Sequence, residues 1–113
     1  MRGELPTHVW VSALLRRASA GGAFAVVLHK GDAERGDVLI KVRAASGSAA
    51  AYAPAFAPGE ASFERVGSSD EEDAVDDLIR RRLGRDRDLW VIEIEDREGR
   101  HFLTERVISS SSS

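Results

Sequence analysis

The segment from Asp88 to Asp96 (DLWVIEIED) constrains the fold of this chain more than any other. Its side chains alternate between two kinds of surface, and successive side chains in a β-strand point to opposite sides. The segment Asp96–Arg100 follows with Gly99 available for a turn, so we expect residues 101–103 to pair back as a hairpin. One face of the strand carries Trp90, Ile92 and Ile94, and the other carries Leu89, Val91, Glu93 and Glu95.

Four further segments have strand patterns. Residues 23–30 (AFAVVLHK) have a mostly buried pattern, and residues 37–44 (DVLIKVRA) alternate between a buried face and a mostly solvated one. The polar turn 31–36 between them predicts an antiparallel hairpin. Residues 50–56 form a weaker strand, which Pro54 interrupts or places at a sheet edge, because proline lacks a donor for the ladder. Residues 62–66 return the chain as a further strand.

The first helix is predicted from His8 to Ala20, where apolar residues recur at helical spacing. Thr7 precedes it as the expected N-cap. The Gly21-Gly22 pair ends it, because glycine adopts the left-handed conformation that is common just past a helix.

The second helix is predicted to begin near Asp70, where Ser69 and Glu72 match a capping box, and to end at Gly84. Its carboxylates precede its arginines, an order that complements the helix dipole. Helical spacing also predicts two ion pairs, Asp76–Arg80 and Asp77–Arg81.

These elements predict an α+β fold in which a mostly antiparallel sheet of about five or six strands is packed by two α-helices. The chain has 113 residues, which suits a single domain over residues 1–108. Residues 109–113 are all serine and are expected to form a disordered tail.

The composition excludes several classes of chemistry. The chain contains no cysteine, which excludes disulfides, thiolate zinc sites and a cysteine nucleophile. No run of residues approaches the length of a membrane span, and we expect a cytoplasmic protein. The histidines also lack the i, i+4 spacing of helical metal motifs, so no metal or cofactor is expected. These histidines are His8, His29 and His101.

The sharpest candidate site combines Glu93, Glu95 and His101. Two carboxylates at positions i and i+2 of a strand project to the same side, Asp96 follows them, and a histidine across the expected hairpin would complete a metal site or an acid–base pair. We favour the alternative that both glutamates lie on a solvated face and form cross-strand ion pairs. Their partners would then be Lys41, Arg43 or Arg100.

The arginines from Arg80 to Arg87 form a second candidate, a phosphate or nucleic-acid site. Carboxylates precede and interleave with them, and no aromatic residues alternate with them as a stacking platform. The net charge of −3 also disfavours a nucleic-acid partner. We therefore favour a solvated helix end that matches the helix dipole.

A third candidate is an interaction surface at Tyr52, Pro54 and Phe56. These residues share one face of the strand that Pro54 is expected to place at a sheet edge. Exposed edge strands are common docking sites for partner chains, so this segment predicts contact with another protein or with a second copy of the chain.

Four stretches of the chain resemble an uncharacterised family, the domain of unknown function DUF1491, which is known mainly from alphaproteobacteria. The last of them is the most specific, and together they span nearly the whole chain except the serine tail. The resemblance implies a small single-domain protein without an assigned reaction or ligand, and it carries over no catalytic residue. The stretches are residues 10–17 (WVSALLRR), 22–32 (GAFAVVLHKGD), 52–54 (YAP) and 88–99 (DLWVIEIEDREG).

The sequence leaves the biochemical activity unknown and favours a small non-enzymatic accessory or protein-interaction domain, because no catalytic set is recognisable. One alternative is a metal-binding protein or hydrolytic enzyme that uses Glu93, Glu95 and His101. The other is a weak nucleic-acid or phosphate binder that uses Arg80–Arg87.

Overall fold

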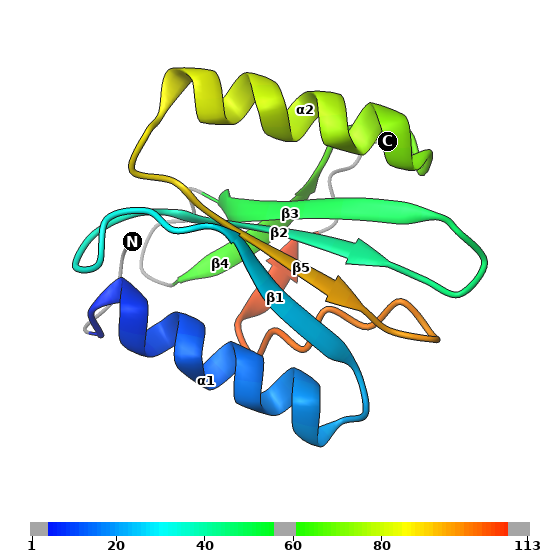
Figure 1. Cartoon of the computed structure of the whole chain (residues 1–113), viewed down its shortest axis with the longest axis horizontal. Helices are drawn as coiled ribbons and strands as arrows, with labels where there is room; N and C mark the ends of the chain where they lie inside the picture. Colours follow the sequence, from blue (N-terminus) through cyan, green and yellow to red (C-terminus); the bar gives the residue numbers. More distant parts are fainter. Residues whose placement is uncertain (1–4, 56–60, 109–113) are drawn as a thin grey trace.

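The computed structural model describes residues 5–55 and 61–108, which form two helices and six strands (Figure 1). Both predicted helices and the long strand near residue 90 are confirmed. The elements are α1 (Thr7–Ala20), β1 (Phe24–His29), β2 (Val38–Arg43), β3 (Ala49–Ala55), β4 (Ser62–Val66), α2 (Glu72–Arg85), β5 (Trp90–Glu95) and β6 (Arg106–Ile108).

The six strands form one sheet in the order β1-β5-β2-β3-β4-β6 (Figure 1). The prediction of two helices and a sheet of about five or six strands is confirmed, but the sheet is mixed rather than mostly antiparallel. The ladders β2–β5 and β4–β6 are parallel, whereas β1–β5, β2–β3 and β3–β4 are antiparallel.

Both hairpins predicted from adjacent segments are wrong. β5 lies between β1 and β2, so these two sequential strands do not pair with each other. Residues 101–103 form no strand, and Phe102 adopts a φ of 60°, in the left-handed region that breaks an extended strand. The chain after β5 instead crosses to the far edge, where β6 pairs with β4.

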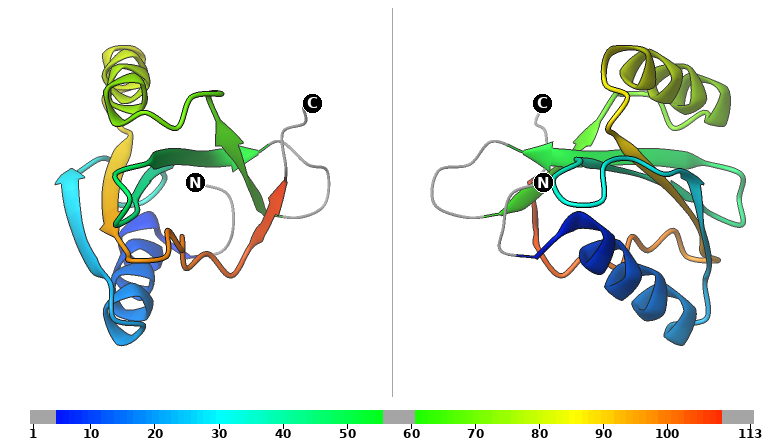
Figure 2. Two further views of the ribbon diagram at one scale, coloured as in Figure 1. Left: turned by 90° about the vertical axis from the view of Figure 1, so that its right-hand side faces the viewer. Right: turned by 60° about the vertical axis from the view of Figure 1, so that its left-hand side comes forward.

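The two helices cover opposite faces of the sheet, which we call the α1 face and the α2 face (Figure 2). On the α1 face, Trp10 and Leu14 pack with the even-numbered apolar residues of β2 and β5. On the α2 face, Val75 and Ile79 pack with Leu39 and other residues of the sheet. Strands β2 and β5 are thus covered on both faces, as central strands between helices usually are.

This arrangement corrects the expectation that one face of residues 37–44 is mostly solvated. Leu39 and Lys41 belong to that face, and both are buried beneath α2. In the sequence, a lysine within an alternating strand predicts a solvent-exposed face, because lysine is seldom buried without a partner. In this fold α2 supplies the partners of Lys41, the carboxylates of Glu72 and Asp76.

The helix ends also differ from their predicted caps. Thr7 is the first residue of α1 rather than its cap, and its hydroxyl donates to the carbonyl oxygen of Gly36 at 2.8 Å. At α2, Ser69 accepts a hydrogen bond from the backbone N–H of Glu71 and makes no capping bond to the helix. Gly84 lies inside α2, which ends at Arg85.

The predicted ion pairs of α2 form with different partners. Asp77 pairs with Arg80 at i, i+3 rather than with Arg81. Asp76 contacts Lys41 on the sheet rather than Arg80 on its own helix. The tertiary partner is preferred because Lys41 is buried and brings its charge directly beneath the helix.

The loop 31–36 crosses the backbone that leads into β5 at very close range. A Cβ added to Gly31 would overlap the carbonyl oxygen of Asp88 and lie 2.6 Å from its carbonyl carbon. The backbone N–H of Asp32 donates to the same Asp88 oxygen at 3.0 Å, and the indole of Trp90 donates to the carbonyl oxygen of Asp32 at 2.7 Å. Glycine at this crossing therefore serves close backbone packing.

Candidate functional site

Glu93 and Glu95 lie on the α2 face of β5, beside the two basic residues of β2. The parallel ladder places Lys41 next to Glu93 and Arg43 next to Glu95. Arg43 forms an ion pair with Glu95, and its Nε lies 3.5 Å from a carboxylate oxygen of Glu93. These are the cross-strand ion pairs that the sequence favoured over a metal site.

Lys41 is the buried centre of this charged group. Its side chain is only 5% exposed, and its ammonium donates to Glu72 at 2.6 Å and to Asp76 at 2.8 Å. Burial by itself would lower the pKa of Lys41, but the hydrogen bonds to Asp76 and Glu72 and the charge of Glu93 outweigh it and raise the pKa. Lys41 therefore stays charged at neutral pH and cannot act as a general base there.

His101 lies on the other side of the sheet from the two glutamates. Its ring contacts Tyr52 edge-on at 5.1 Å between centroids, and Tyr52 packs with the cluster on the α1 face. The Nδ1 atom of His101 accepts a hydrogen bond from the backbone N–H of Leu103 at 3.0 Å. Burial lowers the pKa of His101, which favours its neutral form.

The predicted Glu93–Glu95–His101 site therefore does not come together. Within residues 5–55 and 61–108, no group of three or more histidine, aspartate or glutamate side chains is arranged to hold a metal ion. The Nδ1 atom of His29 contacts the backbone carbonyl oxygen of Leu89 at 2.8 Å. His8 is exposed in the first turn of α1.

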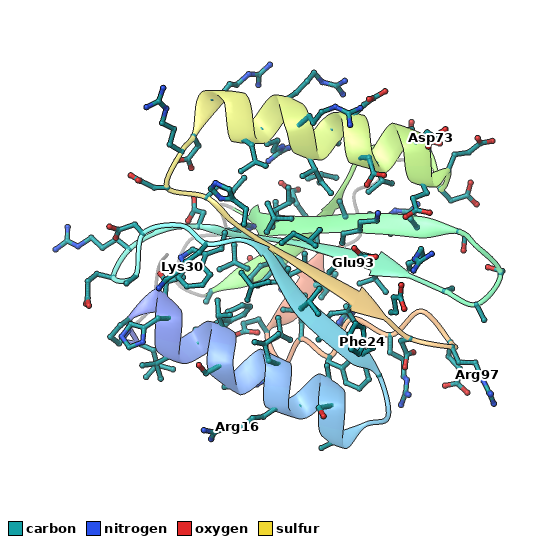
Figure 3. The ribbon with its side chains drawn as sticks, viewed as in Figure 1. Arg16, Phe24, Lys30, Asp73, Glu93 and Arg97 are labelled. Carbon is teal, nitrogen blue, oxygen red and sulfur yellow. The ribbon has the colours of Figure 1, made fainter. Side chains whose placement is uncertain are left out.

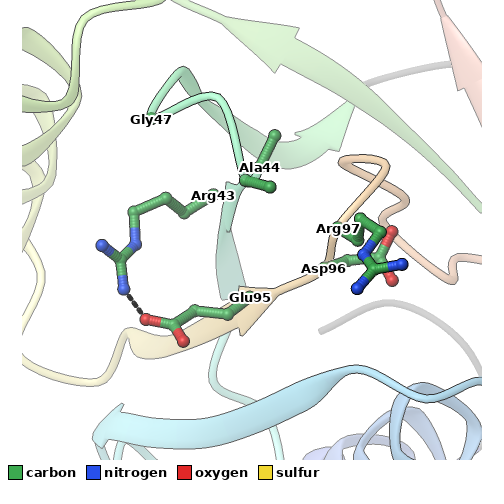
Figure 4. A pocket seen from close by; sticks show the side chains of 7 residues that line it. Arg43, Ala44, Gly47, Glu95, Asp96 and Arg97 are labelled. Carbon is green, nitrogen blue, oxygen red and sulfur yellow. Dashed lines mark ion pairs between the residues drawn. The ribbon is translucent and has the colours of Figure 1, made fainter.

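A shallow hollow of about 370 Å³ lies where β2 and β5 end, and the Arg43–Glu95 ion pair reaches across one side of it (Figure 4). Arg97 and Asp96 lie on the other side of the hollow. Each charged group of the ion pair is already neutralised by the other. Arg43 and Glu95 consequently offer a ligand little charge that the protein does not already use.

Asp96 is a buried carboxylate that organises the segment after β5. Its Oδ2 atom accepts hydrogen bonds from the backbone N–H groups of Glu98 and Arg100, at 3.1 and 2.8 Å. The Arg100 guanidinium donates to both carboxylate oxygens, at 3.0 and 2.8 Å. These hydrogen bonds from Arg100 are the main reason that the pKa of Asp96 falls to about 2.

Arg100 then ties this segment to α1. Its Nη2 atom donates to the carbonyl oxygen of Gly21 at 3.0 Å, and its guanidinium lies 4.8 Å from the centre of the Phe102 ring. Arg17 of α1 donates to the Phe102 carbonyl oxygen at 3.0 Å. The sequence predicted only a turn here, because a buried aspartate has no periodic signature.

We expect the Asp96–Arg100 contact to make the free energy of unfolding fall more steeply as the pH is lowered into the acid range. A carboxyl with a folded-state pKa of about 2, below its ordinary 3.8, stabilises the fold above pH 3.8, and this contribution is lost as the pH falls through about 2. In urea denaturation at a series of pH values, D96N should be less stable than the unsubstituted protein at neutral pH. The difference should shrink below pH 3.8.

The control for this measurement is E98Q. The Glu98 side chain is well exposed and lies 3.6 Å from Arg100, so E98Q removes a nearby carboxylate without removing the buried one. Its stability difference should stay nearly constant across the same pH range. A difference for D96N that stays constant as well would contradict the role assigned to the Asp96 carboxylate.

Tyr52 and Pro54 lie on β3, which is an internal strand. β3 is flanked by β2 and β4, so the expectation that Pro54 places this segment at a sheet edge is wrong. The ladder between β2 and β3 ends at the Ile40–Tyr52 pair, before Pro54, whereas the ladder to β4 continues to Ala55. Phe56 lies outside the described residues, and contact of this segment with a partner stays a prediction.

The arginines from Arg80 to Arg87 lie in different surroundings. Arg80 pairs with Asp77, whereas Arg82 and Arg85 line a cleft between the end of α2 and the sheet. Arg81 and Arg87 are exposed and do not line that cleft. Binding of phosphate or nucleic acid by the whole set stays a prediction.

The sheet edge that the sequence missed is β1. Residues 23–30 were expected to be mostly buried, but the side chains of Phe24 and Leu28 are 63% and 52% exposed, and Val27 is also exposed. Among the described strands β1 pairs with β5 alone, and the ladder is irregular between Val27 and His29. Figure 3 shows Phe24 at the amino end of this strand. Apolar residues in an edge strand look like core residues in the sequence, because the pattern does not reveal which strands have one neighbour.

The fold and these sites together define a small α+β protein with one helix on each face of a mixed sheet. Neither of the two helices in the described residues is long and apolar enough to cross a membrane. The family model "Protein of unknown function (DUF1491)" matches residues 5–104, and the chain belongs to this family.

Three solved structures resemble the chain along almost its whole length. A crystal structure of a DUF1491 family protein from Caulobacter crescentus is 47% identical, with a TM-score of 0.90, and the match covers 93% of this chain and all of that one. An NMR structure of a DUF1491 family protein from the same organism is 45% identical, with a TM-score of 0.87 over 96% of this chain and all of that one.

A solution structure of protein Atu0922 from A. tumefaciens is 31% identical, with a TM-score of 0.81, and the match covers 98% of this chain and all of that one. No curated protein matches the chain. The resemblance stated from the sequence is confirmed, and it brings no activity with it.

Proposed function

We propose that this chain is a protein-interaction domain whose partner is a second copy of itself, joined through the edge strand β1. The observation that carries the proposal is an edge strand whose exposed side chains are apolar. Phe24 and Leu28 are each more than half exposed, and residues 23–28 (AFAVVL) contain no charge.

The two edges of the sheet differ in a way that favours β1. An unprotected edge strand presents unpaired backbone groups to any neighbouring chain, and proteins usually limit this with short strands or charged residues. β6 has three residues and begins with Arg106, whereas β1 has six residues and its first charged neighbour in the chain is Lys30. The irregular ladder between Val27 and His29 is the protective feature that β1 does have.

A second copy is the partner that this strand fits best. Antiparallel pairing of two identical strands is symmetric, so the same strand of each copy forms the interface and the assembly closes as a dimer. The net charge of −3 makes two copies repel each other weakly, but β1 itself brings no like charges together. Pairing of β1 with β6 of another copy would leave further edges open and would form chains rather than a closed dimer.

Two more exposed apolar residues lie at the amino end of the helix that packs against β1. Leu5, which precedes α1, and Val9, in its first turn, are the other large apolar side chains with high exposure in the described residues. α1 packs against β1, so these side chains belong to the layer that lies beside the edge strand. A pairing of strands alone would bury less area than a stable dimer needs, and this adjoining layer would add to it.

Sedimentation velocity over a range of protein concentrations tests the proposal. We expect a concentration-dependent species of twice the 12.3 kDa chain mass, together with slower amide exchange across residues 24–28 as the dimer forms. F24K/L28K should remain monomeric, because it places two lysines of each copy in the interface. Both positions are already more than half exposed, so the monomer should keep its fold.

The matched control is A45K/S46K, which adds the same charge at exposed positions between β2 and β3. This variant should dimerise like the unsubstituted protein. A protein that is monomeric at every concentration would overturn the proposal. A dimer that persists in F24K/L28K would place the interface elsewhere and would also overturn it.

A further inference from the structure

We infer that the cleft between the last turns of α2 and strands β2 and β3 binds a small amphiphilic anion, a molecule with an apolar body and one carboxylate or phosphate group. The cleft has a volume of about 370 Å³, which lies within the range of small-ligand pockets. It is separate from the Arg43–Glu95 hollow, which has no residue in common with it.

The cleft exists because two neighbouring strands stop pairing beneath a helix. The β2–β3 ladder ends at Ile40 and Tyr52, and Pro54 cannot donate a backbone hydrogen bond to extend it. β3 nevertheless continues in its ladder with β4 as far as Ala55. Leu39 of β2 and Ala53 and Pro54 of β3 line the cleft at this point, and the carboxyl end of α2 contributes to the lining.

The floor of the cleft is apolar. Leu39, Ala53 and Leu89 line it, and all three belong to the buried cluster on the α2 face. Pro54 lines the same cleft. An apolar floor at the edge of a core favours a ligand with a hydrocarbon or aromatic body, because burying that body removes apolar area from water.

The rim carries two arginines whose side chains have no ion-pair partner among the described residues. Arg85 follows Arg82 by three positions, which places both residues on the same side of α2. Neither guanidinium forms an ion pair or a side-chain hydrogen bond with residues 5–55 or 61–108. Guanidinium groups bind carboxylate and phosphate through paired N–H donors, so an anionic group fits beside them.

Two carboxylates on the same rim limit the charge of the ligand. Asp37 and Asp86 also line the cleft, and Asp86 accepts a hydrogen bond from the backbone N–H of Asp88 at 3.0 Å. Their negative charge would repel a polyanion such as a nucleic-acid strand but leaves room for a single anionic group placed at the arginines. Arg82 and Arg85 line the cleft and the other arginines between Arg80 and Arg87 do not, so the ligand expected here differs from the nucleic acid considered for the whole set.

The test is a titration followed by two-dimensional NMR, with hexanoate, hexyl phosphate, hexanol and inorganic phosphate as probes. We expect hexanoate or hexyl phosphate to shift the amide signals of Leu39, Ala53 and Leu89 with an affinity in the millimolar range, as suits so small a ligand. The tighter of the two identifies the anionic group. Hexanol and inorganic phosphate should each bind more weakly, because each lacks one half of the ligand.

Variants assign the binding to the two arginines. R82Q/R85Q should weaken hexanoate or hexyl phosphate about tenfold or more, the loss expected for charge-assisted hydrogen bonds. R81Q/R87Q removes the same charge from arginines that do not line the cleft and should leave the affinity unchanged. Both pairs are exposed, so the fold should tolerate either change.

Three results would overturn the inference. The first is the absence of any shift at Leu39, Ala53 and Leu89. The second is binding of hexanol as tight as that of the tighter of hexanoate and hexyl phosphate, which would remove the role of the arginines. The third is binding of a single-stranded oligonucleotide that R82Q/R85Q and R81Q/R87Q weaken equally, which would indicate a nucleic-acid surface over the whole helix end instead.

Discussion

G31A is expected to lower the free energy of unfolding by about 3 kcal/mol, at the upper end of the usual cost of overpacking. The added methyl group would overlap the carbonyl oxygen of Asp88 and lie 2.7 Å from the carbonyl carbon of Leu89. Both atoms belong to the backbone that leads into β5, so no side chain can rotate to make room. Relief requires the loop 31–36 to move away, which would weaken the hydrogen bond from Asp32 to Asp88.

The control for this prediction is G84A, which makes the same chemical change at an open position. Gly84 lies inside α2, and an added Cβ there would meet no atom within 4 Å beyond its chain neighbours and the backbone of its own helix. Alanine favours the helix by about 0.5–1 kcal/mol over glycine, so G84A should raise the stability. Urea denaturation of both variants measures the two effects. A G31A protein as stable as the unsubstituted one would show that the backbones do not cross so closely.

Removing the acids that contact Lys41 should destabilise the fold more than removing Lys41 itself. E72Q/D76N is expected to cost about 2–3 kcal/mol, because it leaves a buried ammonium without its two charged acceptors. K41M should cost only about 1 kcal/mol. The Glu72 and Asp76 side chains are 35% and 39% exposed, so water can solvate the carboxylates that Lys41 leaves behind.

E71Q/D73N is the matched control for the double variant, because both acids are exposed at the same end of α2. Its effect should stay below about 1 kcal/mol, the size of exposed interactions with the helix dipole. Chemical denaturation at neutral pH measures all three proteins. Because the pKa of Lys41 is raised above 10.5, its contribution should persist at neutral pH and disappear only as the pH rises through that raised pKa. A larger loss in K41M than in E72Q/D76N would refute the asymmetry.

The comparison of β1 with β5 shows where prediction from sequence stops. Both segments are rich in apolar residues, and both were predicted as strands. β5 has neighbours on both sides and a helix on each face, whereas β1 has β5 as its single neighbour in the part of the chain that the structure describes. Periodicity reports which side chains share a face, but it carries no information on how many strands lie alongside. The best candidate interaction surface was therefore recognisable only after the strand order was known.

The candidate sites were predictable only where they depend on local alternation, and not where they depend on which strands pair. The pairing of Glu93 and Glu95 with basic residues of β2 was weighed from the sequence, and the parallel ladder beside Lys41 and Arg43 bears it out. The cleft below Arg82 and Arg85 was not predictable, because it depends on the point where β2 and β3 stop pairing. The position of His101 depended on a hairpin that does not form.

The strand from Trp90 to Glu95, with its two distinct faces, is what the sequence alone determined most securely. Trp90, Ile92 and Ile94 pack on the α1 face, and Leu89 and Val91 pack on the α2 face, because alternation along a strand is a local property of the backbone. Tertiary structure decided its neighbours, a parallel β2 on one side and an antiparallel β1 on the other. Contacts between segments distant in the chain depend on the packing of the whole sheet, and local patterns do not encode them.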